Sequence, residues 1–89
     1  RVALMPGAGG DAVAPAAEAG ADVLVCGDLK HHDALDALAL GLAVIDAGHY
    51  ATEQPVVSSL AQYLSLRVGE DAKIIESRVV TDPFADDEC

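Results

Sequence analysis

Apolar runs alternate with helix-like segments along the 89-residue chain. Four runs have the length and composition of strands, namely VALM (2–5), ADVLVCG (21–27), LAVIDAG (42–48) and KIIESRVV (73–80). The second run is apolar at almost every position, which is typical of a strand buried on both faces of a parallel sheet. Between these runs, the pattern predicts helices over 11–20, 31–41 and 53–69.

Individual residues refine two of these helices. In the helix over 31–41, Leu35, Leu38 and Leu42 fall along one side and are expected to face the core. Thr52 is expected to cap the helix over 53–69, because a threonine hydroxyl can satisfy a free amide at a helix start. Pro55 then lies in the first turn of that helix, where little hydrogen bonding is lost.

The order strand, helix, strand, helix, strand, helix, strand predicts an α/β fold with a mostly parallel sheet of about four strands and flanking helices. We expect residues 1–81 to form this lobe and residues 82–89 to form an acidic tail. Ligands bind at the carboxyl ends of the strands in such sheets. The polar stretches PGAGGD (6–11), CGDLKHH (26–32) and DAGHYATE (46–53) all follow strands, so they are expected to converge at that edge.

Composition narrows the classes of partner. The net charge of −10 argues against nucleic acid and anionic membrane as partners. The sequence shows no signal peptide and no apolar stretch near the roughly 20 residues that span a bilayer. Cys26 and Cys89 do not suggest a disulfide framework, so a cytoplasmic location is expected. The chain starts at Arg1 on an apolar run, which we interpret as a C-terminal fragment of a longer protein.

The glycine-rich turn after the first run allows two interpretations. Gly7, Gly9 and Ala12 fit the G-x-G-x-x-A pattern, with Asp28 after the next strand, which is formally a dinucleotide-binding fingerprint. Against it, Pro15 disturbs the helix that should present its amides to a phosphate. The simpler interpretation, which we favour, is a tight turn that needs glycine for its backbone angles.

The stretch DAGHYATE is the sharper signal. His49 and Glu53 offer an imidazole nitrogen and a carboxylate oxygen, a mixed pair suited to zinc, iron or manganese. Alternatively, Glu53 only complements the helix dipole and His49 is solvated, and spacing alone favours this second interpretation. In CGDLKHH, Asp28 and His32 are further candidates, although adjacent histidines on a helix point about 100° apart.

The stretches GADVLVCGDLKHHDALDA, GLAVIDAGHYATEQPVV and TDPF together resemble the C-terminal half of the dinuclear-metal-centre proteins, which are also called Nif-three-like proteins or GTP cyclohydrolase I type two homologues. The resemblance covers nearly the whole chain. It implies a two-lobed protein assembled as a toroidal homo-hexamer, with two divalent metal ions (zinc, iron, manganese or magnesium) between the lobes.

In this resemblance, His49 and Glu53 fall on the metal ligands that the C-terminal lobe supplies. The remaining ligands belong to an N-terminal lobe outside this sequence, so the fragment alone is expected to hold metal weakly or not at all. Asp28 and His32 then become cavity or second-shell residues. Cys26 replaces the threonine that is usual in the family, which places a thiol near the cavity.

The function expected from the resemblance is a dinuclear metal-dependent hydrolase acting on a small molecule or nucleotide, similar to a GTP cyclohydrolase. A metal-bound, ring-forming scaffold or regulatory interaction protein is the alternative. A dinucleotide-binding domain that uses Gly7, Gly9 and Asp28 is a third and weaker possibility.

Overall fold

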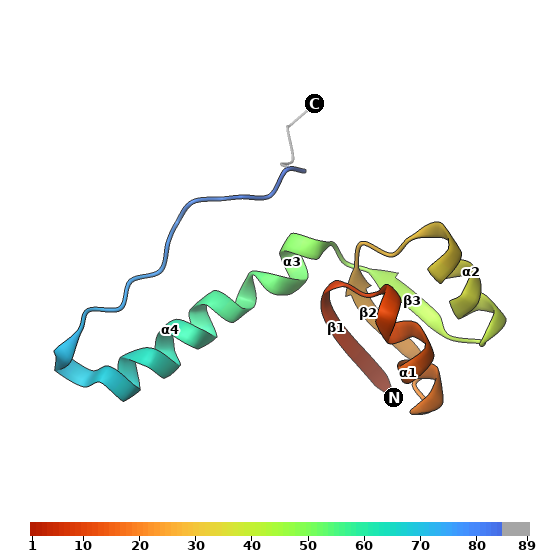
Figure 1. The fold of residues 1–89 in the computed structure, drawn as a ribbon, viewed down its shortest axis with the longest axis horizontal. Coiled ribbons are helices and arrows are strands. Elements are labelled where there is room, and N and C mark those ends of the chain that lie inside the picture. Colours follow the sequence, from red (N-terminus) through yellow and green to blue (C-terminus); the bar gives the residue numbers. More distant parts are fainter. Residues whose placement is uncertain (85–89) are drawn as a thin grey trace. The chain divides into compact units, whose positions relative to one another are not determined.

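The computed structural model describes residues 1–84 and separates into two compact units, Arg1–Glu53 and the chain from Gln54 onward. The first unit contains β1 (Val2–Ala8), a 3-10 turn (Gly10–Ala12), α1 (Val13–Glu18), β2 (Val23–Gly27), α2 (His31–Ala39), β3 (Ala43–Asp46) and α3 (His49–Glu53). The second contains α4 (Pro55–Val68) and a 3-10 turn (Gly69–Asp71) (Figure 1). Within residues 1–84, no helix is long and apolar enough to cross a membrane.

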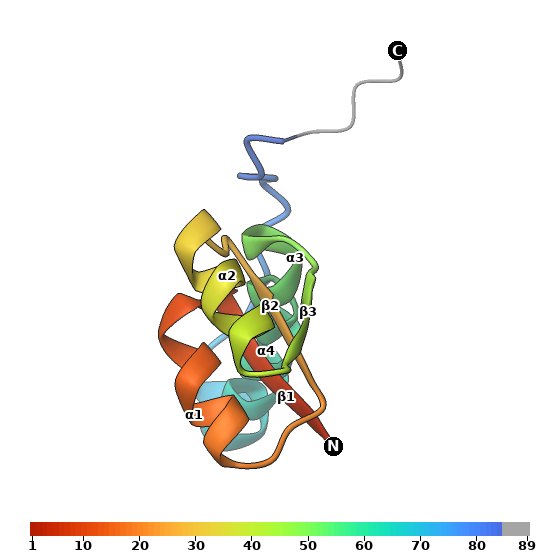
Figure 2. The same cartoon turned by 90° about the vertical axis from the view of Figure 1, so that its right-hand side faces the viewer.

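The three strands of the first unit form a parallel sheet in the order β1-β2-β3. Val25 in the middle strand lies in register between Leu4 and Ile45. Both connections run in the same direction along the sheet, so α1 and α2 lie beside each other on one face (Figure 2). The predicted α/β class, with parallel strands and flanking helices, is confirmed, and the sheet has three strands.

The core lies between this sheet and the two helices. Its buried members are small or medium in size, namely Val13, Ala16, Leu24, Cys26, Ala37 and Leu42. Small side chains let the helices approach the sheet closely, which suits a chain that is 52% hydrophobic but only 3% aromatic. The alanine-rich composition therefore allows a thin, close-packed core between the sheet and the helices.

The predicted apolar side of α2 is only partly correct. Ala37 is 1% exposed and Leu42 is buried, whereas Leu35 and Leu38 are 48% and 75% exposed. Residues two apart on a helix point about 200° apart, so the face that buries Ala37 turns Leu35 away from the core. The buried face of α2 therefore carries an alanine, whereas the sequence pattern predicted that leucines would face the core.

The predicted fourth strand over 73–80 is wrong. This segment is extended in the structure but belongs to no strand. A strand exists only when its backbone groups pair with a neighbour. The described residues of the second unit include α4 and a 3-10 turn but no strand with which this segment could pair. The link that the structure shows from this segment to α4 is a hydrogen bond from the Ser58 hydroxyl to Glu76 Oε1, at 2.5 Å.

The helix predicted over 53–69 is confirmed as α4, and a short helix that was not predicted, α3, precedes it. α3 already begins at His49 and ends at Glu53, and α4 begins at Pro55. Proline has no N–H to donate to the carbonyl of Ala51, so the first helix cannot run through it. The expected position of Pro55 in the first turn of a helix is confirmed for α4. Of the predicted acidic tail, residues 85–89 lie outside the residues that the structure describes.

Candidate metal centre

The carboxyl ends of the three parallel strands meet at one edge of the sheet, and the predicted polar stretches converge there. β1 leads into the glycine-rich turn, β2 ends at Gly27 just before Asp28, and β3 ends at Asp46 just before the turn into α3. The convergence follows from the parallel arrangement alone. It brings residues that are more than 40 positions apart in sequence into contact.

His49 and Glu53 form the centre of this edge. They are the first and last residues of α3, and residues four apart on a helix share one face. His49 Nε2 lies 3.1 Å from Glu53 Oε2, and the two side chains are 42% and 54% exposed. An imidazole nitrogen and a carboxylate oxygen are thus held side by side at the surface.

Asp28 contacts the other side of the same imidazole ring. Its Oδ2 lies 2.7 Å from His49 Nδ1, although the two residues are 21 positions apart. The hydrogen bond to Asp28 raises the pKa of His49 above its ordinary value of 6.5, and the negative charges of Glu53 and Asp28 act in the same direction. Partial desolvation of the ring opposes this rise. When the ring is protonated, its two N–H groups can donate to Asp28 and to Glu53.

Gly7 lies directly beneath the pair. A Cβ atom at this position would be 2.3 Å from Glu53 Oε1 and 3.2 Å from His49 Nε2. Its φ of +75° also lies in the region that side chains rarely adopt. Glycine is therefore required here twice, for the backbone turn and for the space that the two side chains occupy.

Thr52 ties α3 to β1 and is not a helix cap. Its hydroxyl donates to the carbonyl of Gly48 at 2.8 Å, with the carbonyl of His49 at 3.1 Å. The same oxygen accepts the N–H of Gly7 at 2.8 Å. The predicted cap is wrong because α3 begins three residues earlier. Thr52 instead bonds back to the preceding turn, as threonine often does inside a helix.

The start of α3 approaches β2 so closely that only glycine fits beneath it. A Cβ on Gly27 would be 2.5 Å from the backbone nitrogen of His49. Gly48, with φ of +94°, supplies the turn that brings His49 into this position. Neither Gly27 nor Thr52 was predicted to build the site. A G-D dipeptide at a strand end was the available signal for the first.

Asp28 and His32 have different positions relative to this centre. Asp28 touches His49, which places it next to the candidate ligands. His32 is exposed on the first turn of α2, and its ring stacks edge-on against His31 with centroids 5.6 Å apart. In the described part of the chain, the structure shows no hydrogen bond or ion pair between His32 and His49 or Glu53.

The glycine-rich turn is accounted for by contacts within the protein. The amide of Gly9 donates to the carbonyl of Gly27 at 2.9 Å, and the amide of Gly7 donates to Thr52. A Cβ on Gly9 would be 2.2 Å from Cys26 Cβ, so this glycine is needed for close packing. The amides of Gly7 and Gly9 therefore have partners inside the protein, which favours the turn interpretation over the dinucleotide one.

Cys26 does not line the candidate centre. Its side chain is 0% exposed and belongs to the core. Burial raises the pKa of its thiol, with a smaller contribution in the same direction from the charge of Asp46. The expectation of a thiol near the cavity is wrong, because alternate residues of a strand face opposite sides and position 26 falls on the helix-covered face.

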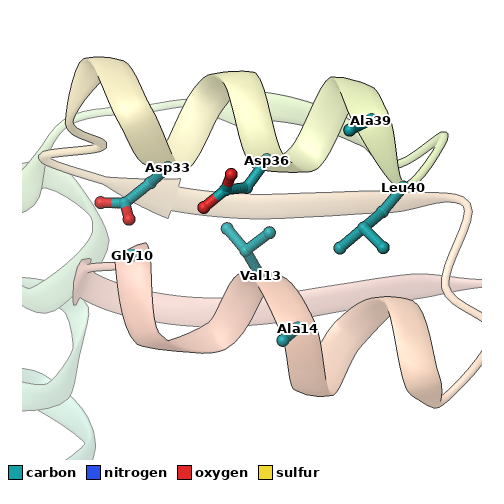
Figure 3. A pocket seen from close by; sticks show the side chains of 7 residues that line it. All are labelled: Gly10, Val13, Ala14, Asp33, Asp36, Ala39 and Leu40. Carbon is teal, nitrogen blue, oxygen red and sulfur yellow. The ribbon is translucent and has the colours of Figure 1, made fainter.

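A separate hollow lies between α1 and α2 (Figure 3). It has a volume of about 350 Å³, and Asp33 and Asp36 of α2 point toward α1 across it. Neither His49 nor Glu53 is among its lining residues. Its floor is apolar, with Val13 and Leu40, and we assign it no role in the centre.

The donor pair fits a shared divalent ion. Metal–ligand distances of about 2.0–2.2 Å place two ligand atoms about 2.9 Å apart at a 90° angle and about 3.4 Å apart at a tetrahedral angle. The observed 3.1 Å between His49 Nε2 and Glu53 Oε2 lies in this range. Within residues 1–84, no cluster of three or more His, Cys, Asp or Glu side chains is arranged to hold a metal. Two donors alone are too few for a complete metal site.

Comparisons with known proteins agree over almost the entire chain. The sequence model of the family described as Duf34/NIF3 (NGG1p interacting factor 3) matches residues 1–83. A Clostridium perfringens protein named GTP cyclohydrolase 1 type 2 homolog is 32% identical over 84 residues, which are 94% of this chain and 32% of that protein.

Solved structures show the same similarity. The crystal structure of a Bacillus cereus protein related to NIF3 matches with a TM-score of 0.82 at 34% identity, over 94% of this chain and 24% of that one. A Staphylococcus aureus protein described as hypothetical matches with a TM-score of 0.81 at 41% identity, over 96% and 29%. The chain thus spans between 24% and 32% of the length of these three proteins.

Proposed function

Because this chain belongs to the Duf34/NIF3 family, we propose that its sheet edge supplies His49 and Glu53 as ligands to a dinuclear metal centre. The observation that carries this proposal is the convergence of His49 Nε2 and Glu53 Oε2 at 3.1 Å over a glycine. The remaining ligands come from other parts of the full-length protein, since two ligands do not make a tight site.

The reaction that suits such a centre is hydrolysis of a small molecule or nucleotide. Two bound divalent ions lower the pKa of water and polarise a carbonyl or phosphoryl oxygen. His49 and Glu53 would hold the ions at the sheet edge, while Gly7 leaves room for both side chains and Thr52 anchors α3 to β1. The name of the Clostridium perfringens relative, GTP cyclohydrolase 1 type 2 homolog, supports a nucleotide as the first substrate to test.

Elemental analysis of the full-length protein, purified without chelators, tests the metal assignment. We expect near-stoichiometric zinc, iron, manganese or magnesium in the wild type and strong loss in His49→Ala. His31→Ala is the matched control, because it removes an exposed histidine whose recorded contact is the neighbouring ring of His32. A wild-type protein without bound metal, or equal loss in both variants, would contradict the assignment.

A second candidate function, a metal-bound homo-hexameric scaffold, is favoured by α4. Several of its apolar residues are 37–61% exposed, among them Val56, Val57, Leu60 and Leu64. Such a surface suits contact with another subunit. Hydrolysis of nucleotides and phosphoesters by the wild type, lost in His49→Ala, identifies an enzyme. Loss of metal that leaves every cellular phenotype intact identifies the scaffold.

A further inference from the structure

Neutral histidine carries one proton on either of two ring nitrogens, and only the nitrogen without the proton can bind a metal. In this structure both nitrogens of His49 face carboxylates. Asp28 Oδ2 lies 2.7 Å from Nδ1, and Glu53 Oε2 lies 3.1 Å from Nε2. The two carboxylates therefore compete for a single proton when the ring is neutral, and the shorter contact favours Asp28.

The backbone around Asp28 holds it in this position. Its φ of +43° is the one positive value outside glycine in residues 1–84. Aspartate and asparagine tolerate this conformation better than most residues. Outliers of this kind persist where the surroundings enforce them, and they cluster at functional sites. Asp28 directly follows Gly27, the residue that the backbone of His49 approaches closely.

Asp46 connects the two segments that carry the pair. Its Oδ2 accepts the N–H of Leu29 at 3.2 Å, and its Oδ1 accepts the N–H of Gly48 at 3.1 Å. Leu29 follows Asp28 in the chain, and Gly48 precedes His49. One carboxylate at the end of β3 thus fixes the backbone on both sides of the Asp28–His49 contact.

We propose that Asp28 is a positioning residue, which keeps the proton of neutral His49 on Nδ1 and leaves the Nε2 lone pair free beside Glu53 for a metal ion. The role of the lone pair rests on the proposed function, whereas the position of the proton does not. A carboxylate partner on the far nitrogen fixes both the tautomer and the ring orientation of a metal-binding histidine, and it makes the ligand more basic.

Asparagine at position 28 reverses the competition. It retains the shape and the backbone preference of aspartate but has no charge, so the charged Glu53 is the stronger acceptor. The proton then moves to Nε2, where it must be displaced before a metal ion can bind, so metal affinity falls. Asp28→Gly is the second variant, because it relieves the positive φ while it also removes the acceptor. If relief of backbone strain at position 28 decided the Zn²⁺ affinity, Asp28→Gly would bind Zn²⁺ more tightly than the wild type.

The test uses nitrogen NMR of the histidine rings in the metal-free, full-length protein, at a pH high enough for neutral imidazole. We expect the Nδ1–H tautomer at His49 in the wild type and the Nε2–H tautomer in Asp28→Asn and Asp28→Gly. Asp36→Asn removes the same charge from an exposed position on α2 and is expected to leave the tautomer unchanged. An Nε2–H tautomer in the wild type, or an unchanged tautomer in Asp28→Asn, overturns the proposal.

Titration of the same proteins with Zn²⁺ alone provides a second measurement. Loss of a partner of this kind typically lowers metal affinity about 10–100-fold. We expect that loss in both Asp28 variants and none in Asp36→Asn. Unchanged Zn²⁺ affinity in Asp28→Asn overturns the proposed role of the lone pair. A wild type that binds no Zn²⁺ overturns the proposed function, while the ring signals still decide where the proton lies.

Discussion

The two units of the chain contain similar apolar residues but use them differently. Arg1–Glu53 has a sheet with α1 and α2 packed on one face and α3 at its edge, and it contains all six buried hydrophobic residues of the described chain. The described part of the second unit, residues 54–84, contains helical and extended segments with no buried residue. Local sequence is sufficient for a helix, but a core needs a second layer against which the apolar face can pack.

The candidate centre belongs to the unit that has a core. α3 contacts β1 and β2, and its position is fixed by glycines that allow close approach. The side chains of the centre are only half-buried, so their geometry depends on the backbone beneath them. Precise sites are generally built on such rigid elements.

The largest difference between the units is expected from leucine truncation in the 89-residue chain. Leu24→Ala empties a fully buried position and should lower the free energy of unfolding by about 2–5 kcal/mol. Leu60→Ala, at a position that is 52% exposed on α4, should change it by about 0.5 kcal/mol or less. Urea unfolding of both variants measures this difference. Equal effects would show that the second unit has a core of its own.

A smaller effect is expected from adding one methyl group beneath the centre. Gly27→Ala places a Cβ against the backbone of His49 and should cost about 1–3 kcal/mol of stability. In the control, Gly10→Ala, the new Cβ meets the carboxylate of Asp33, which can rotate away, so the cost should be about 0.5 kcal/mol or less. Thermal unfolding ranks the two. If Gly10→Ala were the more damaging, the close approach of α3 to β2 would not be the critical contact.

The smallest expected effect is a dependence of stability on pH in the metal-free protein. The pKa of His49 is raised in the folded state, so the protonated ring stabilises that state fully below its unfolded pKa of about 6.5. This stabilisation is lost as pH rises through the raised folded value. Asp28→Asn removes the main cause of the raised pKa.

Thermal unfolding midpoints between about pH 5 and pH 9 test this dependence. The midpoint of the wild type should exceed that of Asp28→Asn most at the acidic end, and the difference should shrink toward the alkaline end. A difference that grows with pH would mean that the contact stabilises the neutral ring instead. Because the groups are exposed, added salt should weaken the effect.

The sequence predicted the first three strands, the α/β class and the convergence of three polar stretches at one edge. These depend on the alternation of apolar runs and turns, which is local information. It did not predict where α3 begins, because the residue before His49 is Gly48, which has no side chain to mark a helix start. The family resemblance also placed the Cys26 thiol near the cavity, since a sequence pattern shows that a strand is buried but not which face each residue takes.

The sequence by itself determined that His49 and Glu53 stand four residues apart, with Asp28 after the preceding strand and glycines at the strand ends. Only the tertiary structure decided that Asp28 meets Nδ1 and Glu53 meets Nε2 of the same ring. The physical reason is that helical spacing fixes contacts four residues apart, whereas a contact across 21 residues requires two parallel strands to end together. The fourth strand was not formed for a related reason, because pairing depends on a neighbour that no local pattern can supply.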